Sequence, residues 1–276
     1  REVDFQLGLD LMKKLADGPL HLCCTEFAST KALIEAKGVS LHRFNGKQQS
    51  GDAAVQVYHV APPGPKETVW TVGYQDLLTI SRSLSAGHLV AERVVGFGGP
   101  GASEPRTLRT RLGAAVESVT RGKVRAGEMR YVSGGILNGT AVDAAGHLGF
   151  YDSSLIVLPE GRGRELLGFV RPGFGRYSLS RAWISSFLPG GEHDFNTNLG
   201  GSLRNFVLQG VEEDLCPVGI WPQEAAKAVL AEDFEEMEKH GVLDCAECGL
   251  CTFVCPSKIE VAEILRRGID MIHKEG

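Results

Sequence analysis

The chain has 276 residues, of which 43% are hydrophobic and 23% charged, and its formal net charge is −5. This composition is ordinary for a soluble globular protein with room for two or three domains. No apolar run approaches the roughly 18 to 20 residues that a membrane-spanning helix needs, so we expect no direct membrane span. Lys and Arg form no concentrated stripe with interleaved aromatic residues, which argues against nucleic-acid binding.

The first part of the chain alternates helical and strand-like patterns. Helices are expected at residues 4–16, 30–36 and 74–85, and strands at 20–24, 39–44, 55–60 and 69–72. Such alternation predicts an α/β layer. Cys23 and Cys24 are adjacent in one expected strand, so their side chains point to opposite faces, and we assign them structural roles.

A glycine-rich turn follows the next expected strand, at residues 89–97. Residues 96–101 satisfy the G-x-G-x-x-G spacing of dinucleotide-binding loops. We reject that function, because Pro100 and Pro105 interrupt the helix that should follow the third glycine. In addition, the region where an acidic strand end should come is expected to be helical, at residues 112–119. We therefore expect no flavin or NAD in this chain.

The middle of the chain is richer in strands and turns. A strand, the glycine turn, a helical segment and a strand at 131–132 follow one another up to about residue 151, an order compatible with a β-grasp domain. Further strands are expected at 154–158, 166–170 and 177–179, and a Gly- and Asn-rich linker at 189–202.

The last part of the chain is expected to be helical and acidic. Pro222 suits the first position of a helix, and Asp233 resembles the N-terminal cap of the next one. Apolar residues at helical spacing form inward faces, among them Ala225, Val229 and Leu230. Residues 208–276 contain six Lys/Arg against fifteen Asp/Glu, whereas residues 104–186 contain twelve against seven. The two regions therefore face different surroundings.

Residues 244–256 carry the strongest motif of the chain, C-x2-C-x2-C-x3-C-P. Cys245, Cys248 and Cys251 recur at every third residue, so that a tight loop can turn three thiolates toward one iron–sulfur cluster. Cys255 is the fourth cysteine of this run. A zinc site is the main alternative, although zinc sites normally use two separated C-x2-C pairs. Unpaired cysteines beside a cluster indicate the reducing cytoplasm.

A second Cys-Pro, at Cys216, indicates which thiol completes the cluster. In two-cluster ferredoxins the cysteine before proline binds the cluster of the other run. Cys216 ends an earlier run in which the three preceding ligand positions are Phe206, Gln209 and Glu212. That run cannot build a cluster of its own. We therefore predict one [4Fe-4S] cluster bound by Cys216, Cys245, Cys248 and Cys251, with Cys255 as the alternative fourth ligand.

The chain resembles the A subunit family of sodium-translocating NADH:quinone reductases, and its C-terminal region resembles the C subunit of the Rnf complex. The resemblance rests on motifs spread along the chain: Gly73-Tyr74-Gln75-Asp76, Glu92-Arg93-Val94-Val95, Pro105-Arg106, Val157-Leu158-Pro159-Glu160-Gly161 and the run from Leu250 to Pro256. It implies an α/β and α+β multidomain fold. Its parts are a Rossmann-like domain at 1–90, a soluble-ligand-binding (SLBB-type) β-grasp domain with a β-rich extension at 91–198, and a C-terminal helical, ferredoxin-like domain at 199–276.

The same resemblance implies a function. We expect a peripheral subunit on the cytoplasmic face of the inner membrane, with integral-membrane and other subunits of the same ion-translocating NADH:quinone oxidoreductase as partners. Electron transfer, quinone binding or both are its expected roles, with no residue assigned to the quinone. A barrel-sandwich domain normally precedes these domains, so we expect a fragment. Sodium-pump A subunits are not expected to carry iron–sulfur, which leaves open a non-redox scaffold with a vestigial or zinc-filled cysteine site.

Overall fold

The structure is a computed structural model that describes residues 2–64, 67–163, 170–177, 183–188, 193, 195–206 and 210–275. The contacts between residues divide the chain into two compact units. The first unit comprises Arg1–Arg93, Phe206–Cys255 and Ile259–Gly276, and the second comprises Val94–Asn205 and Pro256–Lys258. The α/β layer and the C-terminal helices therefore fold as parts of the same unit. No helix of the described residues is long and apolar enough to cross a membrane.

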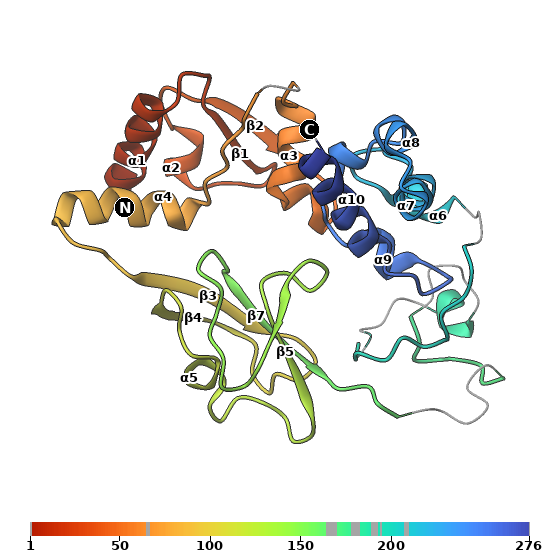
Figure 1. Cartoon of the computed structure of the whole chain (residues 1–276). Coiled ribbons are helices and arrows are strands. Elements are labelled where there is room, and N and C mark those ends of the chain that lie inside the picture. Colours follow the sequence, from red (N-terminus) through yellow and green to blue (C-terminus); the bar gives the residue numbers. More distant parts are fainter. Residues whose placement is uncertain are drawn as a thin grey trace. The chain divides into compact units, whose positions relative to one another are not determined.

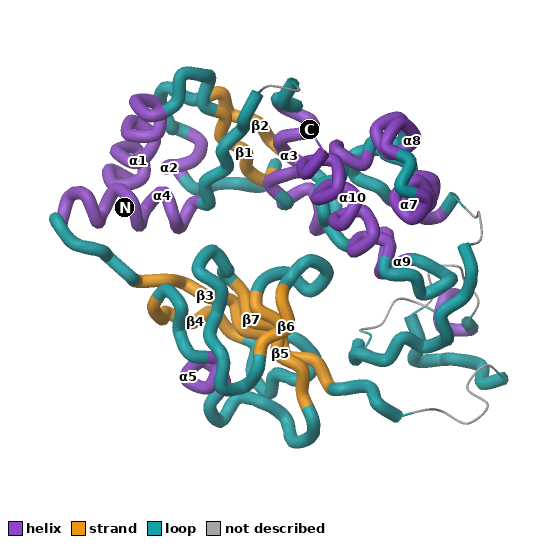
Figure 2. Tube along the Cα trace, viewed as in Figure 1, coloured by secondary structure: helices purple, strands orange, loops and turns teal. Residues whose placement is uncertain are grey.

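The N-terminal part of the first unit combines a small parallel sheet with helices (Figures 1 and 2). Its elements are α1 (Glu2–Leu15), β1 (His21–Thr25), α2 (Lys31–Ile34), β2 (Ser40–Phe44), η1 (Gln48–Gly51), α3 (Ala53–Val60) and α4 (Tyr74–Ala86). β1 and β2 pair in parallel, with Cys23 opposite His42. The helices expected at 4–16, 30–36 and 74–85 and the strands expected at 20–24 and 39–44 are confirmed.

Buried apolar side chains join α1, β1 and α4 into one core. Phe5, Leu9, Leu22 and Leu77 are its buried members. Gly8 allows the two helices to approach, because a Cβ atom at that position would lie 2.7 Å from Leu77 Cγ. A larger residue there would have to push the helices apart.

Two of the expected strands are wrong. Residues 55–60 form most of helix α3, and residues 67–73 have no regular structure. The β-branched valines at 55, 57 and 60 favoured a strand, but Asp52 starts a helix by accepting a hydrogen bond from the Ala54 amide at 3.0 Å. Val55 is buried at 3% exposure, so tertiary packing on one helical face decided the outcome.

The second unit is built on a five-stranded sheet with the order β4-β3-β7-β5-β6. Its elements are β3 (Glu92–Gly98), β4 (Arg106–Arg111), α5 (Val116–Thr120), β5 (Met129–Ser133), β6 (Thr140–Val142) and β7 (Ser154–Pro159). β3 and β7 are parallel, whereas β5 is antiparallel to both of its neighbours. Val95, Val116, Leu155 and Val157 are fully buried in its core.

The glycine motif of this unit is a turn between two strands. β3 ends at Gly98, and β4 follows instead of the helix that a dinucleotide site requires. Gly99 has φ of +103°, and a side chain there would collide with the Val157 carbonyl oxygen. Close backbone approach therefore explains this glycine without a nucleotide.

Several elements of this unit differ from those expected from the sequence. β4 and β6 were not predicted, and the helix expected at 112–119 is shorter, as α5, and begins at Val116. The expected strands at 154–158 and 131–132 are confirmed by β7 and β5. The strands expected at 166–170 and 177–179 lie mainly outside the described residues, as do residues 189–192 and 194 of the linker expected at 189–202.

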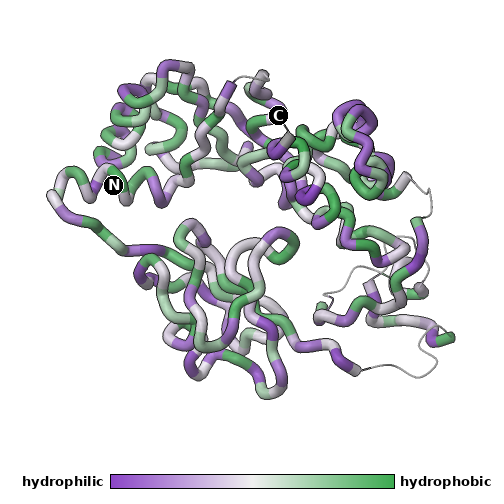
Figure 3. Tube along the Cα trace, viewed as in Figure 1, coloured by the Kyte–Doolittle hydropathy of each residue, from purple (hydrophilic) through white to green (hydrophobic). Residues whose placement is uncertain are grey.

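The C-terminal part of the first unit is helical, as predicted. It contains α6 (Val211–Leu215), α7 (Pro222–Ala231), α8 (Phe234–Lys239), η3 (Val242–Asp244), α9 (Leu250–Val254) and α10 (Val261–Glu275). Pro222 is the first residue of α7, and Asp233 caps α8 by accepting from the Glu236 amide. These helices together carry both hydrophobic and hydrophilic residues (Figure 3). Leu230 was expected to face inward but is 55% exposed, because it lies in the last turn of α7.

Helix α3 packs into the core of these C-terminal helices. Val55 belongs to the same buried cluster as Val218, Ile220 and Val229, and Tyr58 packs against its edge. The His59 ring supplies a polar contact, since its Nε2 lies 2.9 Å from the Pro217 carbonyl oxygen and donates to it. One helix of the α/β part is therefore a structural component of the C-terminal part.

We predict that Val55→Ala destabilises the C-terminal helices. Removing two buried methyl groups from this core should lower the free energy of unfolding by roughly 1 to 3 kcal/mol. Val3→Ala is the matched control, because Val3 is 80% exposed and its truncation should cost less than about 0.5 kcal/mol. Urea unfolding with amide hydrogen exchange checks this. Unchanged exchange in α7 and α10 would contradict the shared core.

Candidate metal centre

Four cysteine thiols line one small cavity in the C-terminal part of the first unit. They are Cys216, Cys245, Cys248 and Cys251, and apolar side chains such as Val218, Ile220 and Leu265 complete the lining. All four cysteines are half-buried. The structure therefore brings together the residues that the crossover rule predicted, although Cys216 is distant from the others in sequence.

Short helices and left-handed turns aim these thiols. Cys216 directly follows α6 and Cys245 directly follows η3, so both stand where a helical backbone changes direction. Glu247 and Gly249, on either side of Cys248, have φ of +49° and +75°. Because non-glycine residues rarely adopt positive φ, Glu247 marks a backbone that tertiary packing holds in place. Its amide also lies 3.4 Å from Cys245 Sγ and donates to it.

Burial dominates the electrostatics of the cavity. It raises the pKa of the Cys245 thiol to about 11 and that of Cys251 to about 12, and it also raises the pKa of Cys248. Repulsion between neighbouring thiolates, including Cys216, adds to the upward shifts. Without a bound metal, the thiols of Cys245, Cys248 and Cys251 are therefore protonated at neutral pH. Metal binding has to displace their protons.

Cys255 lies outside the cavity lining. It follows α9, is 3% exposed, and belongs to the buried apolar core beside the site. Its amide donates to the Cys251 carbonyl oxygen at 3.1 Å, which closes the turn. The fourth cysteine of the run thus has a core position, whereas Cys216 of the earlier run reaches the cavity.

The α/β part contributes to this site, although the sequence pattern did not predict that contribution. Asp52, which precedes α3, is close enough to Cys248 for its negative charge to raise the pKa of that thiol, after burial itself. His59 contacts Pro217, the neighbour of Cys216. The sequence signal for this helix is a capping residue followed by apolar positions at 55 and 58, but the β-branched valines favour a strand.

The positions of the lost earlier run have other occupants. Phe206 packs half-buried against the core, and Glu212 is buried at 1% exposure. Gln209 lies outside the described residues. No three His, Cys, Asp or Glu side chains of the described residues are arranged to hold a single metal ion. A four-iron cluster does not require such convergence, because each thiolate binds a different iron. The donor set and the apolar wall therefore fit a cluster.

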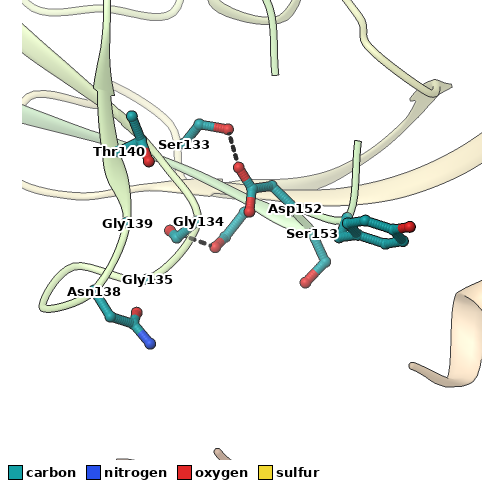
Figure 4. A pocket seen from close by; sticks show the side chains of 10 residues that line it. Ser133, Gly134, Gly135, Asn138, Gly139, Thr140, Asp152 and Ser153 are labelled. Carbon is teal, nitrogen blue, oxygen red and sulfur yellow. Dashed lines mark hydrogen bonds between the residues drawn. The ribbon is translucent and has the colours of Figure 1, made fainter. Parts of the chain in front are cut away.

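A second pocket, of about 250 Å³, lies on the mixed sheet of the second unit (Figure 4). Ser133 Oγ donates to Asp152 Oδ2 at 2.5 Å and accepts from the Gly149 amide at 3.0 Å. Ser154 Oγ donates to the Gly134 carbonyl oxygen at 2.7 Å. These hydrogen bonds join the turn at Ser133 and Gly134 to the turn at Gly149 and Asp152. The two turns form a polar wall that can bind a ligand through hydrogen bonds.

The sequence pattern pointed to no site at the residues of this second pocket. The available signal was the gathering of Ser, Gly, Asn and Asp in two turns of one domain. Asn138 and Thr140 are exposed members of the lining (Figure 4). They offer amide and hydroxyl groups at the pocket edge. An apolar quinone ring would find few partners there.

Comparisons with known proteins agree with the order of these parts. Residues 1–89 match the family described as NqrA second alpha/beta domain, and residues 94–144 match the NQRA C-terminal domain. Residues 213–260 match the 4Fe-4S dicluster domain. The last match includes all five cysteines of the two Cys-Pro stretches.

The chain is also similar along its whole length to named proteins. It is 36% identical to the Na(+)-translocating NADH-quinone reductase A subunit of Rhodopirellula baltica, over 100% of this chain and 61% of that protein. The corresponding protein of Alcanivorax borkumensis is 36% identical, with 100% and 62% covered, and that of Neisseria meningitidis serogroup B is 35% identical, with 99% and 62% covered. The chain thus spans about three fifths of these relatives. On these matches, the chain belongs to the family of the A subunits of Na+-translocating NADH-quinone reductases.

Proposed function

We propose that this chain is part of a peripheral electron-transfer subunit of an ion-translocating NADH:quinone reductase and binds one [4Fe-4S] cluster. Its ligands would be Cys216, Cys245, Cys248 and Cys251. The single observation that carries the proposal is that these four thiols line one cavity, while Cys255 does not. A match to a dicluster domain supports iron–sulfur in this region.

One feature favours a cluster over zinc. Zinc requires its four sulfurs around one ion, about 2.3 Å from it, and no such convergence occurs among the described residues. The Glu247 amide also donates to Cys245 Sγ. Hydrogen bonds to sulfur are one of the means by which proteins set the potential of a cluster.

The chain's own residues have defined tasks in this proposal. The turns at Glu247 and Gly249 orient Cys248, and the His59 ring holds the Cys216-Pro217 turn through its carbonyl oxygen. Val218, Ile220 and Leu265 exclude water from the cavity. The thiols release protons on loading, because burial keeps them protonated beforehand. When bound, a cluster of this kind supplies reversible one-electron transfer.

The names of the relatives support a place for the chain in a membrane-bound complex. We infer that it lies on the cytoplasmic face of the inner membrane and contacts integral-membrane and other subunits of the same reductase. Quinone contact remains part of the proposal, without assigned residues. The parallel β1–β2 pair with its helices supports a Rossmann-like domain at 1–90, the mixed sheet a β-grasp domain at 91–198, and the cysteine-bearing helices a ferredoxin-like domain at 199–276.

Metal analysis after anaerobic purification tests this function. We expect a brown protein with about four iron and four sulfide per chain, as one cluster held by four cysteines requires. The measurements are iron, sulfide and zinc content together with visible absorbance. A colourless protein with one zinc per chain would instead support the non-redox scaffold.

We predict that the Cys216→Ser variant loses most of its iron, whereas the Cys255→Ser variant keeps it. Cys216 lines the cavity, and Cys255 lies in the adjacent apolar core. The two changes are chemically identical, so each controls for the other. Cys255→Ala is a further control for the cost of burying a hydroxyl. Iron retained without Cys216 but lost without Cys255 would refute the ligand assignment.

We predict that, in the chain without a bound metal, the rate of alkylation of Cys245 and Cys251 is low at neutral pH and still rises at pH values well above 7. Only the thiolate reacts, and burial raises the pKa of Cys245 to about 11 and of Cys251 to about 12. Because these values lie above the ordinary 9.0, the thiolate fraction at pH 8 is lower than for a free cysteine. Mass spectrometry after iodoacetamide pulses from pH 7 to 10 measures the rates.

The urea-unfolded chain is the reference for that measurement, since unfolding returns both thiols to water. Its alkylation at Cys245 and Cys251 should level off at lower pH than in the folded chain. Equal pH profiles for folded and unfolded protein would contradict the burial of these thiols.

A further inference from the structure

Three buried side-chain oxygens between α6 and α7 have no hydrogen-bond partner among the described residues. They are Glu212 Oε1, Glu213 Oε2 and Gln223 Oε1. Glu212 and Gln223 are 1% and 2% exposed. Leaving a buried acceptor without a partner costs roughly 1 to 3 kcal/mol, and more if the group is charged. Such a group in a folded protein requires an explanation.

The three side chains meet at Gln223. Its Nε2 donates to Glu212 Oε2 at 2.6 Å, and its backbone amide donates to Glu213 Oε1 at 3.3 Å. The remaining oxygen of each carboxylate shares a carbon atom with the bonded one, and the remaining oxygen of Gln223 belongs to the same amide. The partnerless oxygens therefore belong to one group of three side chains held by mutual bonds.

The chemistry of the missing partner can be argued from the donor types. The set offers two carboxylate oxygens and one amide oxygen, and no thiol or imidazole. Hard divalent cations prefer oxygen ligands of this kind, and protein carbonyls and waters commonly complete their shell. A single proton would satisfy one acceptor only. One divalent cation can bind several oxygen atoms at once and neutralise both carboxylates.

We propose that Glu212, Glu213 and Gln223 form a binding site for a hard divalent cation of the Ca2+ or Mg2+ class. Glu212 stands at the third ligand position of the lost cysteine run, so an oxygen ligand occurs where a dicluster protein has a thiol. The cation would tie α6, and hence the Cys216 turn that follows it, to the start of α7. Its ligands are oxygen atoms and not thiolates, which Ca2+ and Mg2+ bind poorly. Cation binding at this site is therefore independent of cluster binding by the cysteines.

Terbium luminescence tests the site, since Tb3+ takes oxygen ligands as Ca2+ does. Trp221 lies two residues before Gln223 and can sensitise a bound ion. We expect a saturable signal under tryptophan excitation that Ca2+ displaces, and about tenfold weaker Tb3+ binding in both Glu212→Gln and Glu213→Gln. Glu235→Gln, at an exposed carboxylate of α8, is the matched control and should bind as the wild type does.

Further variants keep the test decisive if Glu212→Gln fails to fold. Trp221→Phe should lose the sensitised signal yet retain a Ca2+-induced rise in the melting temperature. The proposal is overturned if the wild type shows no saturable signal or if Glu213→Gln binds Tb3+ unchanged. Iron content, measured in parallel, reports on the cluster separately.

Discussion

The structure of the first unit depends on keeping four half-buried thiols together in one largely apolar cavity. Desolvation disfavours the thiolate form, as the raised pKa values of Cys245 and Cys251 express. A loop of eleven residues cannot exclude water alone, so the cavity wall comes from α10 and from the segment after α6. Helix α3 adds Val55 to the core behind that wall. The cysteine site is therefore a product of the whole unit.

The first unit is therefore built from segments that are far apart in the sequence. Residues 94–205 form their own sheet and core, and the chain returns from them to the unit that it left at Arg93. Arg93 is itself anchored there, because it is 3% exposed and forms an ion pair with Asp76 of α4. Breaking a buried pair leaves an unpaired charge and is costly. The pair thus fixes the point at which the chain leaves the α/β part.

Local signals in the sequence predicted much of this architecture, and tertiary contacts decided the rest. The caps at Pro222 and Asp233 and the period of α10 act within a few residues, so they were readable. The position of Cys216 beside Cys245, Cys248 and Cys251 was also predictable, because the ligand rule of two-cluster ferredoxins links it to these distant cysteines. Helix α3 was missed because the burial of Val55 depends on residues far along the chain. The pairing of Glu212 with Gln223 was missed because it joins two helices across a turn.

Ligand softness gives a physical reason why the two proposed sites would select different metals. One would bind an iron–sulfur cluster and the other a hard divalent cation, in the same small domain. Thiolates select iron–sulfur clusters and soft ions, and carboxylate and amide oxygens select Ca2+ and Mg2+. Replacing the third cysteine of an ancestral run by Glu212 would change the metal preference of that position, while the buried geometry would still demand a partner for the new oxygen. If only one cluster binds, Cys255 serves as a small apolar residue of the core. On the two proposals together, the degenerate run would contribute an oxygen ligand at Glu212, and the cysteine before Pro256 would be a core residue instead of a ligand.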